Sequence, residues 1–550
     1  MTDRFARTDG STTHACNLTE GLYCGGTWKG TIKQLDYIQE MGFDAVMISP
    51  IVKNVEERIA YGEAYHGYWI QDMYALNPHF GTHEDLLDLS QALHDRGMFL
   101  MMDTVINNMA FSTNGGDPAK DVNYTALNPF NKPDFYHSYC KITDWNDYPQ
   151  SQYCWTGDNI VALPDLKTED DRVQTLLNMW IQEMILTYSV DGLRLDAAKH
   201  VTPEFLPQFE EAADIFMFGE VYERSVDIIC GYHNYMTSVT NYPIYFALLD
   251  AFTLGNTDSL PNQVEVMKNS CPDITALTVF SENHDIARFA SMKDDLTTLS
   301  PPRQLAKNIL TFTLLFDGIP IIYQGQEQHF SGTHDPYNRE PLWPSQYNTS
   351  SPLYKHISTL NRIRKHAIQL DPTYYPSYKT YPIYRGSSEM AFRKGREGRQ
   401  IVMVLSTQGS DSGAYKIRMM NGYQPDYVVV DVLSCKTWTV NDMGELRLDM
   451  DKGEPRVLFP ENLMRGSGLC GYPGGRVNYV DFLNTSYSPP TVDEKASERA
   501  AASGGMGAFE KVWVWSWVVL GWGLLGLISF SHALVETYSS FLFSANMVRN

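Results

Sequence analysis

The sequence has little positive charge for its length. Among 550 residues, 43 Lys and Arg stand against 65 Asp and Glu, so the formal net charge is −22 at pH 7. Nucleic-acid-binding proteins need a basic surface that neutralises phosphate, so we expect no nucleic acid as a partner. Hydrophobic residues make up 43% and charged residues 20%, a balance that is typical of globular enzymes and argues against disorder.

The sequence also lacks a Cys-x-x-Cys pair, which argues against a zinc site of the usual spacing. Its eight cysteines form an even set, but eight cysteines allow about 105 pairings, so their order alone does not assign disulfides. N-glycosylation sequons occur at Asn17, Asn123, Asn348 and Asn484. The cysteines and sequons together predict an oxidising compartment, and therefore an extracellular or cell-surface protein.

The first residues lack the apolar stretch of a secretory signal peptide. This leaves two interpretations: a cytosolic protein, or a sequence whose true N-terminus lies upstream. Near the other end, residues 512–530 form a run of 19 uncharged residues, about enough to cross ~30 Å of hydrocarbon. Small residues at 500–505 precede this run as in a GPI-attachment signal, whereas the residues after 530 fit a transmembrane helix better. We predict a linker over 471–510 and a membrane-anchoring tail over 511–550.

Short apolar runs that end in polar residues recur through the first 330 positions, with helix-length patterns such as 84–96 and 172–188 between them. This alternation predicts an α/β parallel sheet, and the length favours a closed (β/α)8 TIM barrel over 1–369. The irregular stretch 109–165 reads as an inserted domain, and β-like runs over 370–470 predict an antiparallel C-terminal domain. The apolar runs cover 44–49, 98–103, 191–196, 215–220, 277–282 and 319–323.

Three motifs place carboxylates at or just after the ends of these runs, where a barrel places its catalytic groups. They are 192–200 with Asp196, 219–221 with Glu220, and 282–285 with Glu282 and Asp285. Two carboxylates about 5–5.5 Å apart are the minimum for retaining glycoside chemistry. One attacks the anomeric carbon while the other donates and then recovers a proton. An aromatic content of 13% fits a sugar ligand that stacks on rings, but also fits ordinary core and surface residues. Each motif alone would equally fit a structural Asp–Arg pair.

These blocks and residues 103–108 resemble the four conserved regions of the α-amylase family of glycoside hydrolases. Residues 2–6, 65–69 and 318–328 resemble secreted fungal α-amylases in particular, and the resemblance extends to about residue 470. It implies a monomer that cleaves internal α-1,4-glucosidic bonds of starch- or glycogen-like glucans through a covalent glycosyl-enzyme. It also implies four sequential disulfides: Cys16–Cys24, Cys140–Cys154, Cys230–Cys271 and Cys435–Cys470.

The resemblance assigns roles by position. Asp196 becomes the nucleophile, Glu220 the general acid/base, and Asp285 the carboxylate that holds hydroxyls of the distorted sugar. Arg194 orients Asp196 and keeps it ionised. The positions that match substrate contacts are His66, Tyr68, Trp69, Asn108, Arg194, Lys199, His200, His284, Asp335 and Arg339.

A calcium site is implied as well. The family holds calcium between barrel and inserted domain with an Asn side chain, an Asp carboxylate and backbone carbonyls. The matching positions are Asn107, Asp165 and the carbonyls of Gln152 and His200. Oxygen-only ligands suit this hard cation.

Three departures from the family pattern keep other functions open. Asn108 stands where the family has His, and larger residues follow Glu220 at 222–224. Asn108 and the tail together resemble a subgroup of GPI-anchored fungal proteins associated with transfer of α-1,4-glucan segments and cell-wall α-glucan. A membrane-anchored 4-α-glucanotransferase and an inactive α-glucan-binding surface protein are therefore the alternatives. Relatives also carry a first barrel strand before the Thr2–Ala6 block, which this sequence lacks, so we expect the complete protein to start upstream.

Overall fold

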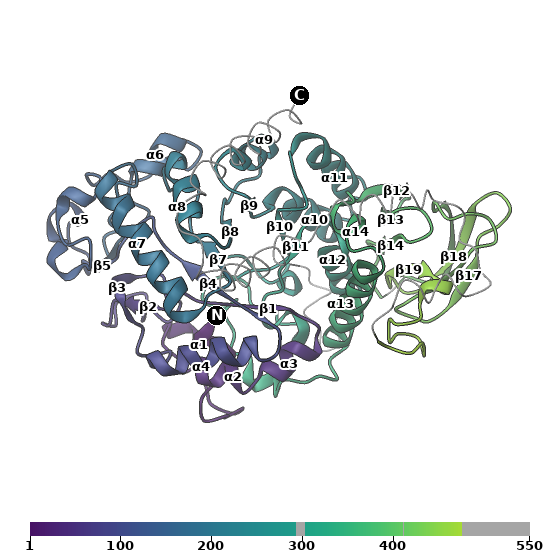
Figure 1. Ribbon diagram of the computed structural model, residues 1–550, viewed down its shortest axis with the longest axis horizontal. Coiled ribbons are helices and arrows are strands. Elements are labelled where there is room, and N and C mark those ends of the chain that lie inside the picture. Colours follow the sequence, from purple (N-terminus) through teal and green to yellow (C-terminus); the bar gives the residue numbers. More distant parts are fainter. Residues whose placement is uncertain (293–302, 411, 476–550) are drawn as a thin grey trace, which may run out of the picture. The chain divides into compact units, whose positions relative to one another are not determined.

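The computed structural model describes residues 1–292, 303–410 and 412–475 (Figure 1). The chain divides into two units, and all described residues belong to the first, Met1–Pro490. Nearly all of the predicted linker and the whole predicted tail over 511–550 lie outside the described residues. Within the described ranges, no helix is long and apolar enough to cross a membrane.

Parallel strands form the centre of the molecule, in the order β1-β4-β7-β8-β9-β10-β11 (Figure 1). A parallel bridge between Thr240 and Thr278 joins the sheet that ends at β9 to the β10–β11 pair. Each of the six predicted apolar runs overlaps one of these strands, whereas β9 lies outside any apolar run and was not predicted. The bounds are β1 Ala45–Ile48, β4 Phe99–Thr104, β7 Gly192–Leu195, β8 Phe216–Gly219, β9 Ser238–Val239, β10 Thr278–Val279 and β11 Ile319–Pro320.

Strand register sets which side chains meet at the end of the sheet. β7 is buried at all four positions, as expected for a strand covered on both faces. Asp103 on β4 lies opposite Arg194 on β7, and Arg194 lies opposite Phe218 on β8. Asp196 and Glu220, which follow the last residues of β7 and β8, therefore leave the sheet side by side.

Helices lie between the strands and are fixed at their first turns by local signals. The two predicted helices are confirmed as α4 and α7. α4 begins with a capping box between Thr82 and Asp85, and α7 begins at the cap Asp170. The longer helices are α4 His83–His94, α7 Asp171–Tyr188, α8 Leu206–Ala213, α10 Tyr242–Leu254, α11 Ser259–Ser270, α12 Gln304–Leu315 and α13 Pro352–Leu370. The shorter ones are α1 Thr2–Phe5, α2 Trp28–Ile32, α3 Leu35–Glu40, α5 Pro118–Asp121, α6 Tyr148–Tyr153, α9 Val226–Gly231 and α14 Tyr374–Ser377.

The sheet has two open edges within the described residues. β1 pairs with β4 alone and β11 pairs with β10 alone. A mainly apolar cavity of about 250 Å³ is lined by residues of both strands, 45–48 and 319–320, and by Met1. The parallel strands of the described residues thus number seven, and both edge strands line this cavity.

The stretch between β4 and α7 leaves the barrel and returns to it. β5 (Phe111–Ser112) pairs with β6 (Val161–Ala162), and a bridge joins Asn108 to Asp165. A second small sheet pairs β2 (Val52–Asn54) with β3 (Ile70–Leu76). Because the two ends of the insert meet, Asn107 and Asp165 become neighbours although 58 positions separate them in the sequence.

After α13 the strands are antiparallel, as the β-like runs predict. Six of them form one sheet in the order β12-β13-β14-β19-β16-β17, and β15 pairs with β18. Asn308 on α12 fixes this part to the barrel, because its amide donates to Gly453 O and accepts from Ser406 N. The bounds are β12 Tyr381–Arg385, β13 Glu389–Lys394, β14 Ile401–Ser406, β15 Tyr415–Met420, β16 Val428–Asp431, β17 Thr437–Thr439, β18 Glu445–Met450 and β19 Arg456–Pro460.

All four implied disulfides are present, each between cysteines that are consecutive in the sequence. The sequon asparagines that lie in described residues are exposed, namely Asn17, Asn123 and Asn348. Both findings fit the predicted oxidising compartment.

Candidate active site

One buried arginine organises the carboxylates at the ends of β4, β7 and β8. The Arg194 side chain is 6% exposed. Its Nη1 atom lies 2.7 Å from Asp103 Oδ2 and 2.9 Å from Asp196 Oδ1, and its Nη2 atom lies 2.8 Å from Glu220 Oε2. A single cation thus brings Asp196 and Glu220 next to each other.

The third predicted carboxylate, Asp285, is held by a second arginine. Arg339 Nη2 lies 3.1 Å from Asp285 Oδ1, and Arg339 Nε donates to the carbonyl oxygen of His284. Tyr68 joins the two halves of the site, because its hydroxyl donates to Asp103 Oδ2 and lies 2.7 Å from His284 Nε2. The structure therefore brings all three predicted catalytic residues into one site.

Access to solvent differs among the three carboxylates. The Asp285 side chain is 38% exposed, compared with 19% for Asp196 and 14% for Glu220. All three reach the surface of the site, while Arg194 beneath them is nearly sealed. A ligand can therefore contact the carboxylates without displacing the cation that arranges them.

Burial shifts the protonation of this group. Burial raises the pKa of Glu220, Arg194 opposes the rise, and the Asp285 charge adds to it. Burial also raises the pKa of Asp196 against the opposing charge of Arg194. For Asp285, burial acts upward, but His284, Arg339 and Arg194 hold its pKa below the ordinary value. Burial thus favours the protonated forms of Asp196 and Glu220, while the neighbours of Asp285 favour its ionised form.

The predicted residues His66, Tyr68 and Trp69 form an aromatic wall beside these carboxylates. The rings of His66 and Tyr68 lie 5.6 Å apart at 16°, and those of Tyr68 and His284 lie 5.3 Å apart at 3°. Trp69 meets His66 edge-on at 4.6 Å. Burial lowers the pKa of His284 to about 3 and also lowers that of His66, so both imidazoles are neutral at neutral pH.

Asp335 and Arg339 lie on the Asp285 side of the site. Arg339 Nη1 pairs with Asp335 Oδ1 at 2.9 Å and donates to the Tyr65 hydroxyl oxygen at 3.2 Å. Tyr65 was not predicted individually, although it opens the 65–69 block. Asp103 begins the 103–108 block but was not predicted as a site residue, and its register opposite Arg194 explains its place here.

Lys199 and His200 lie on the Glu220 side, toward α6. Lys199 Nζ pairs with Glu223 Oε2 at 3.2 Å, and His200 Nδ1 lies 2.7 Å from the Ser151 carbonyl oxygen. Asn108 is buried, and its amide donates to the carbonyl oxygen of Met109. Glu223 and its bond to Lys199 were not predicted.

The residues implied for calcium gather where the insert returns to the barrel. Asp165 is fully buried, its Oδ2 atom lies 2.7 Å from His137 Nδ1, and its Oδ1 atom lacks a hydrogen-bond partner in the described residues. Burial raises the pKa of Asp165 to about 7. Gln152 on α6 adjoins Ser151, which His200 contacts. No group of three His, Cys, Asp or Glu side chains in the described ranges could hold a metal, so a cation here would depend on amide and carbonyl oxygens.

Comparison with known proteins shows which family the chain belongs to. The family model for the α-amylase catalytic domain matches residues 1–344, and the model for α-amylase domain C matches residues 382–478. The chain is 44% identical to alpha-amylase 2 of Schwanniomyces occidentalis over 474 residues, which cover 86% of this chain and 91% of that protein. It is 45% identical to alpha-amylase 1 of Lipomyces kononenkoae, over 86% of this chain and 74% of that protein. The structure of an α-amylase from Malbranchea cinnamomea matches with a TM-score of 0.80 and 46% identity, covering 86% of this chain and 97% of that chain. The chain belongs to the α-amylase family of glycoside hydrolases.

Proposed function

We propose that this enzyme cleaves internal α-1,4-glucosidic bonds of starch- or glycogen-like glucans with retention of configuration. The observation that carries the proposal is the binding of Asp196 and Glu220 to the two ends of one guanidinium group. This places the two carboxyl groups close together, as a retaining enzyme requires, because an inverting enzyme needs room for a water between them.

In the proposed mechanism, Asp196 attacks the anomeric carbon while Glu220 donates its proton to the departing glycosidic oxygen. A covalent glycosyl-enzyme forms. Water then attacks its anomeric carbon, Glu220 takes a proton from that water, and Asp196 is released. Burial raises the pKa of both carboxyls, and Arg194 opposes the rise in both. The opposite roles of Asp196 as nucleophile and Glu220 as acid are therefore assigned from the family resemblance.

Asp285 and the aromatic wall would bind the sugar at the reacting bond. Asp285 is ionised and exposed enough to accept hydrogen bonds from sugar hydroxyls. The Tyr68 ring, fixed through its hydroxyl to Asp103, offers a face for stacking on the sugar. Holding the sugar in this way would orient its anomeric carbon toward Asp196.

Incubation with maltoheptaose and separation of the products by size tests the proposal. Shorter maltooligosaccharides alone would mean hydrolysis. Products longer than maltoheptaose would mean transfer. Binding without any product would support the inactive surface protein, which does not need all three carboxylates.

A second function, 4-α-glucanotransfer, is favoured by one surface feature beside Glu220. Tyr222 is 51% exposed although it is a large aromatic residue. Its ring packs 4.5 Å from that of Tyr242, whose hydroxyl reaches Glu220 Oε1. Arg224 covers the face of Phe246 at 4.1 Å on the same side. A sugar acceptor could stack on Tyr222 and compete with water for the glycosyl-enzyme.

Replacing Tyr222 with alanine tests this platform. We expect the ratio of transfer to hydrolysis on maltoheptaose to fall by about three- to tenfold, since a stacking contact contributes roughly 0.5–1.5 kcal/mol. Tyr222→Phe should keep the ratio. Tyr374→Ala, at another partly exposed tyrosine on α14, is the matched control and should not change it. An unchanged ratio in Tyr222→Ala would refute the platform.

We also propose calcium as a structural cofactor, held by the Asn107 side chain, Asp165 and the carbonyls of Gln152 and His200. The buried Asp165 Oδ1 atom without a hydrogen-bond partner fits a cation, since an isolated buried carboxylate oxygen is costly. Bound calcium would neutralise this charge and join the insert to the barrel next to the substrate residues.

Calcium removal should lower stability. At about 100 times its Kd, a ligand adds ~2.7 kcal/mol to the free energy of unfolding, so we expect a Tm a few degrees higher in calcium than in EDTA. Asp165→Asn should abolish this difference. Asp117→Asn, at an exposed helix cap in the same insert, should preserve it. The same Tm in calcium and EDTA for the unchanged protein would contradict a calcium site.

We propose that the enzyme acts outside the cell, and the four disulfides and the exposed sequon asparagines support this location. Attachment to a membrane through residues 511–550 stays a prediction from the sequence, as does the monomeric state.

A further inference from the structure

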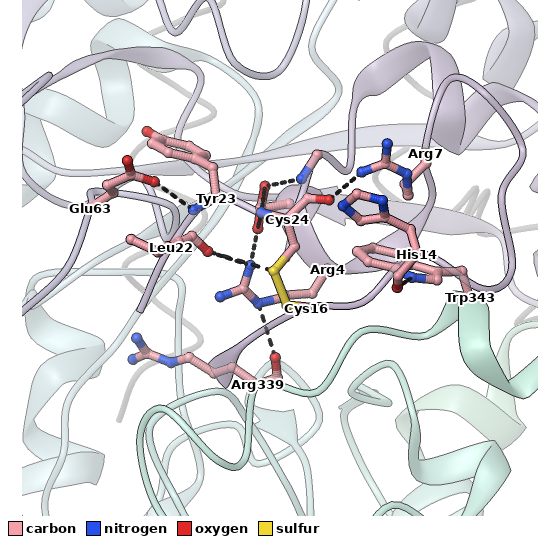
Figure 2. Close-up of a disulfide and its surroundings, with 12 residues drawn as sticks. Arg4, Arg7, His14, Cys16, Leu22, Tyr23, Cys24, Glu63, Arg339 and Trp343 are labelled. Atoms are coloured by element: carbon pink, nitrogen blue, oxygen red, sulfur yellow. Dashed lines mark hydrogen bonds and ion pairs between the residues drawn. A yellow bond between two sulfur atoms is a disulfide. The ribbon is translucent and has the colours of Figure 1, made fainter. Parts of the chain in front are cut away.

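Helix α1 carries a buried ion pair that the proposed mechanism does not use. Asp3 and Arg4 are both 0% exposed. Figure 2 shows Arg4 between the Cys16–Cys24 disulfide loop on one side and Arg339 on the other. A fully buried arginine is costly to maintain unless its surroundings satisfy it, so its contacts indicate what it supports.

Arg4 donates hydrogen bonds to three different segments. Its Nε atom donates to the Arg339 carbonyl oxygen at 3.1 Å, and its Nη1 atom donates to the Leu22 carbonyl oxygen at 3.0 Å and to Asp3. Its guanidinium carbon lies 3.9 Å from the centre of the Tyr65 ring. Arg4 therefore contacts both the backbone of Arg339 and the ring of Tyr65.

The other end of this network is fixed by the disulfide loop. Asp3 accepts hydrogen bonds from the backbone N–H groups of Cys24 and Gly25, at 2.9 and 3.0 Å. Cys24 is bonded to Cys16, and the loop is also anchored by Trp343, whose indole donates to the His14 carbonyl oxygen (Figure 2). The loop thus holds Asp3, and Asp3 holds Arg4.

From Arg339 the contacts continue to the reacting centre. The Tyr65 hydroxyl lies 3.2 Å from Arg339 Nη1, and Arg339 Nη2 lies 3.1 Å from Asp285 Oδ1. Arg4 donates to the backbone of Arg339 and lies over the ring of Tyr65, and the Tyr65 hydroxyl contacts the Arg339 guanidinium. The position of the Arg339 fork against Asp285 is therefore defined from two directions.

We propose that Arg4 is a positioning residue, which acts through Arg339 and Tyr65 to fix the orientation of Asp285, and that the Cys16–Cys24 loop anchors it. The proposal rests on the proposed function for its kinetic consequence. Lysine cannot replace Arg4, because one ammonium group cannot reach Asp3, Leu22 and Arg339 with the geometry of a planar fork.

The kinetic test compares Arg4→Lys and Arg4→Met with Arg7→Met on maltoheptaose. Arg7 lies in the same region and donates to the Cys24 carbonyl oxygen and to Asp9, but none of its bonds involves Arg339. We expect both Arg4 variants to lower kcat by roughly 10- to 100-fold with KM within about threefold, as small displacements of catalytic groups do. Arg7→Met should keep kcat within about threefold. Equal kcat losses in Arg4→Met and Arg7→Met would overturn the proposal, since general loosening of the loop would explain both.

A double-mutant cycle tests whether the effect passes through Arg339. In an Arg339→Lys background the contact to Asp285 is already disturbed, so Arg4→Met should lower kcat by less than about threefold more. Full additivity of the two losses would contradict positioning through Arg339. Tm values for all variants separate loss of folded protein from loss of kcat.

One measurement does not depend on the reaction. The Arg339 Nε–H group donates to the His284 carbonyl oxygen at 2.9 Å, so its ¹⁵N–¹H signal, assigned through Arg339→Lys, should be protected from exchange. We expect Arg4→Met to accelerate this exchange at least tenfold and Arg7→Met to leave it unchanged. Unchanged exchange in Arg4→Met would overturn the proposal, whereas inactivity of the unchanged enzyme would refute only the proposed function.

Discussion

Asp196→Asn should lower kcat on maltoheptaose by on the order of 10⁴-fold, the scale seen when a residue of a covalent catalytic group is removed. Asparagine keeps the shape of the side chain but removes the nucleophilic oxygen charge. Arg194 would lose one of its three carboxylate partners and keep the other two. The loss should therefore appear in kcat rather than in the stability of the site.

Asp191→Asn is the matched control, because Asp191 lies immediately before the same strand, at its opposite end. It accepts hydrogen bonds from the backbone of Leu100 and contacts His94, and barrel enzymes react at the carboxyl ends of their strands. We expect this variant to change Tm more than kcat. If Asp191→Asn lost as much activity as Asp196→Asn, the assignment of the nucleophile would fail.

Azide rescue distinguishes the nucleophile from the acid/base. With an α-maltosyl fluoride substrate, Asp196→Ala plus azide should release fluoride and form the β-maltosyl azide, since azide enters from the side that Asp196 occupied. An α-azide from this variant would assign Asp196 the other role.

Glu220→Gln should lower kcat on maltoheptaose by about 10²- to 10⁴-fold, the usual contribution of general acid–base catalysis. Glutamine cannot donate the proton that the departing glycosidic oxygen needs. With the α-maltosyl fluoride, the first step should be nearly unaffected because fluoride leaves without protonation. Stopped-flow release of fluoride measures that step directly.

The control for this substitution is Glu210→Gln on α8, the helix that precedes β8, where the carboxylate accepts from the backbone N–H of Thr237. It should keep kcat on both substrates. In Glu220→Ala, azide should give the α-maltosyl azide. If Glu220→Gln slowed the first, fluoride-releasing step as much as it lowered kcat on maltoheptaose, the acid role would be ruled out.

The proposed catalytic carboxylates Asp196 and Glu220 could be located in the sequence because strand ends are marked by apolar runs that stop at a charged residue. Parallel strands bring such ends to one edge, so Asp196 and Glu220 had to meet once β7 and β8 were neighbours. Asp285 required the family resemblance, since β10 is only two residues long and its run does not fix a register. The disulfide pairing likewise came from the resemblance and not from cysteine spacing.

Contacts between distant segments could not be predicted. The pairing of Lys199 with Glu223 depends on the conformation of the loop after β8. The hydrogen bond from Arg4 to Arg339 joins positions 335 apart in the sequence. No periodicity marks either one. β9 was not predicted for a different reason: it is two residues long and Ser238 is polar, so the sequence has no apolar run there.

The central claim is that this enzyme cleaves α-1,4-glucans by a retaining mechanism. The most direct test is ¹H NMR of the new reducing ends in the first minutes of maltoheptaose cleavage, before mutarotation. The account predicts the α anomer, because one guanidinium binds both Asp196 and Glu220 and keeps their carboxyl groups close together, as in a retaining enzyme. Release of the β anomer, or binding of maltoheptaose without any cleavage, would contradict it.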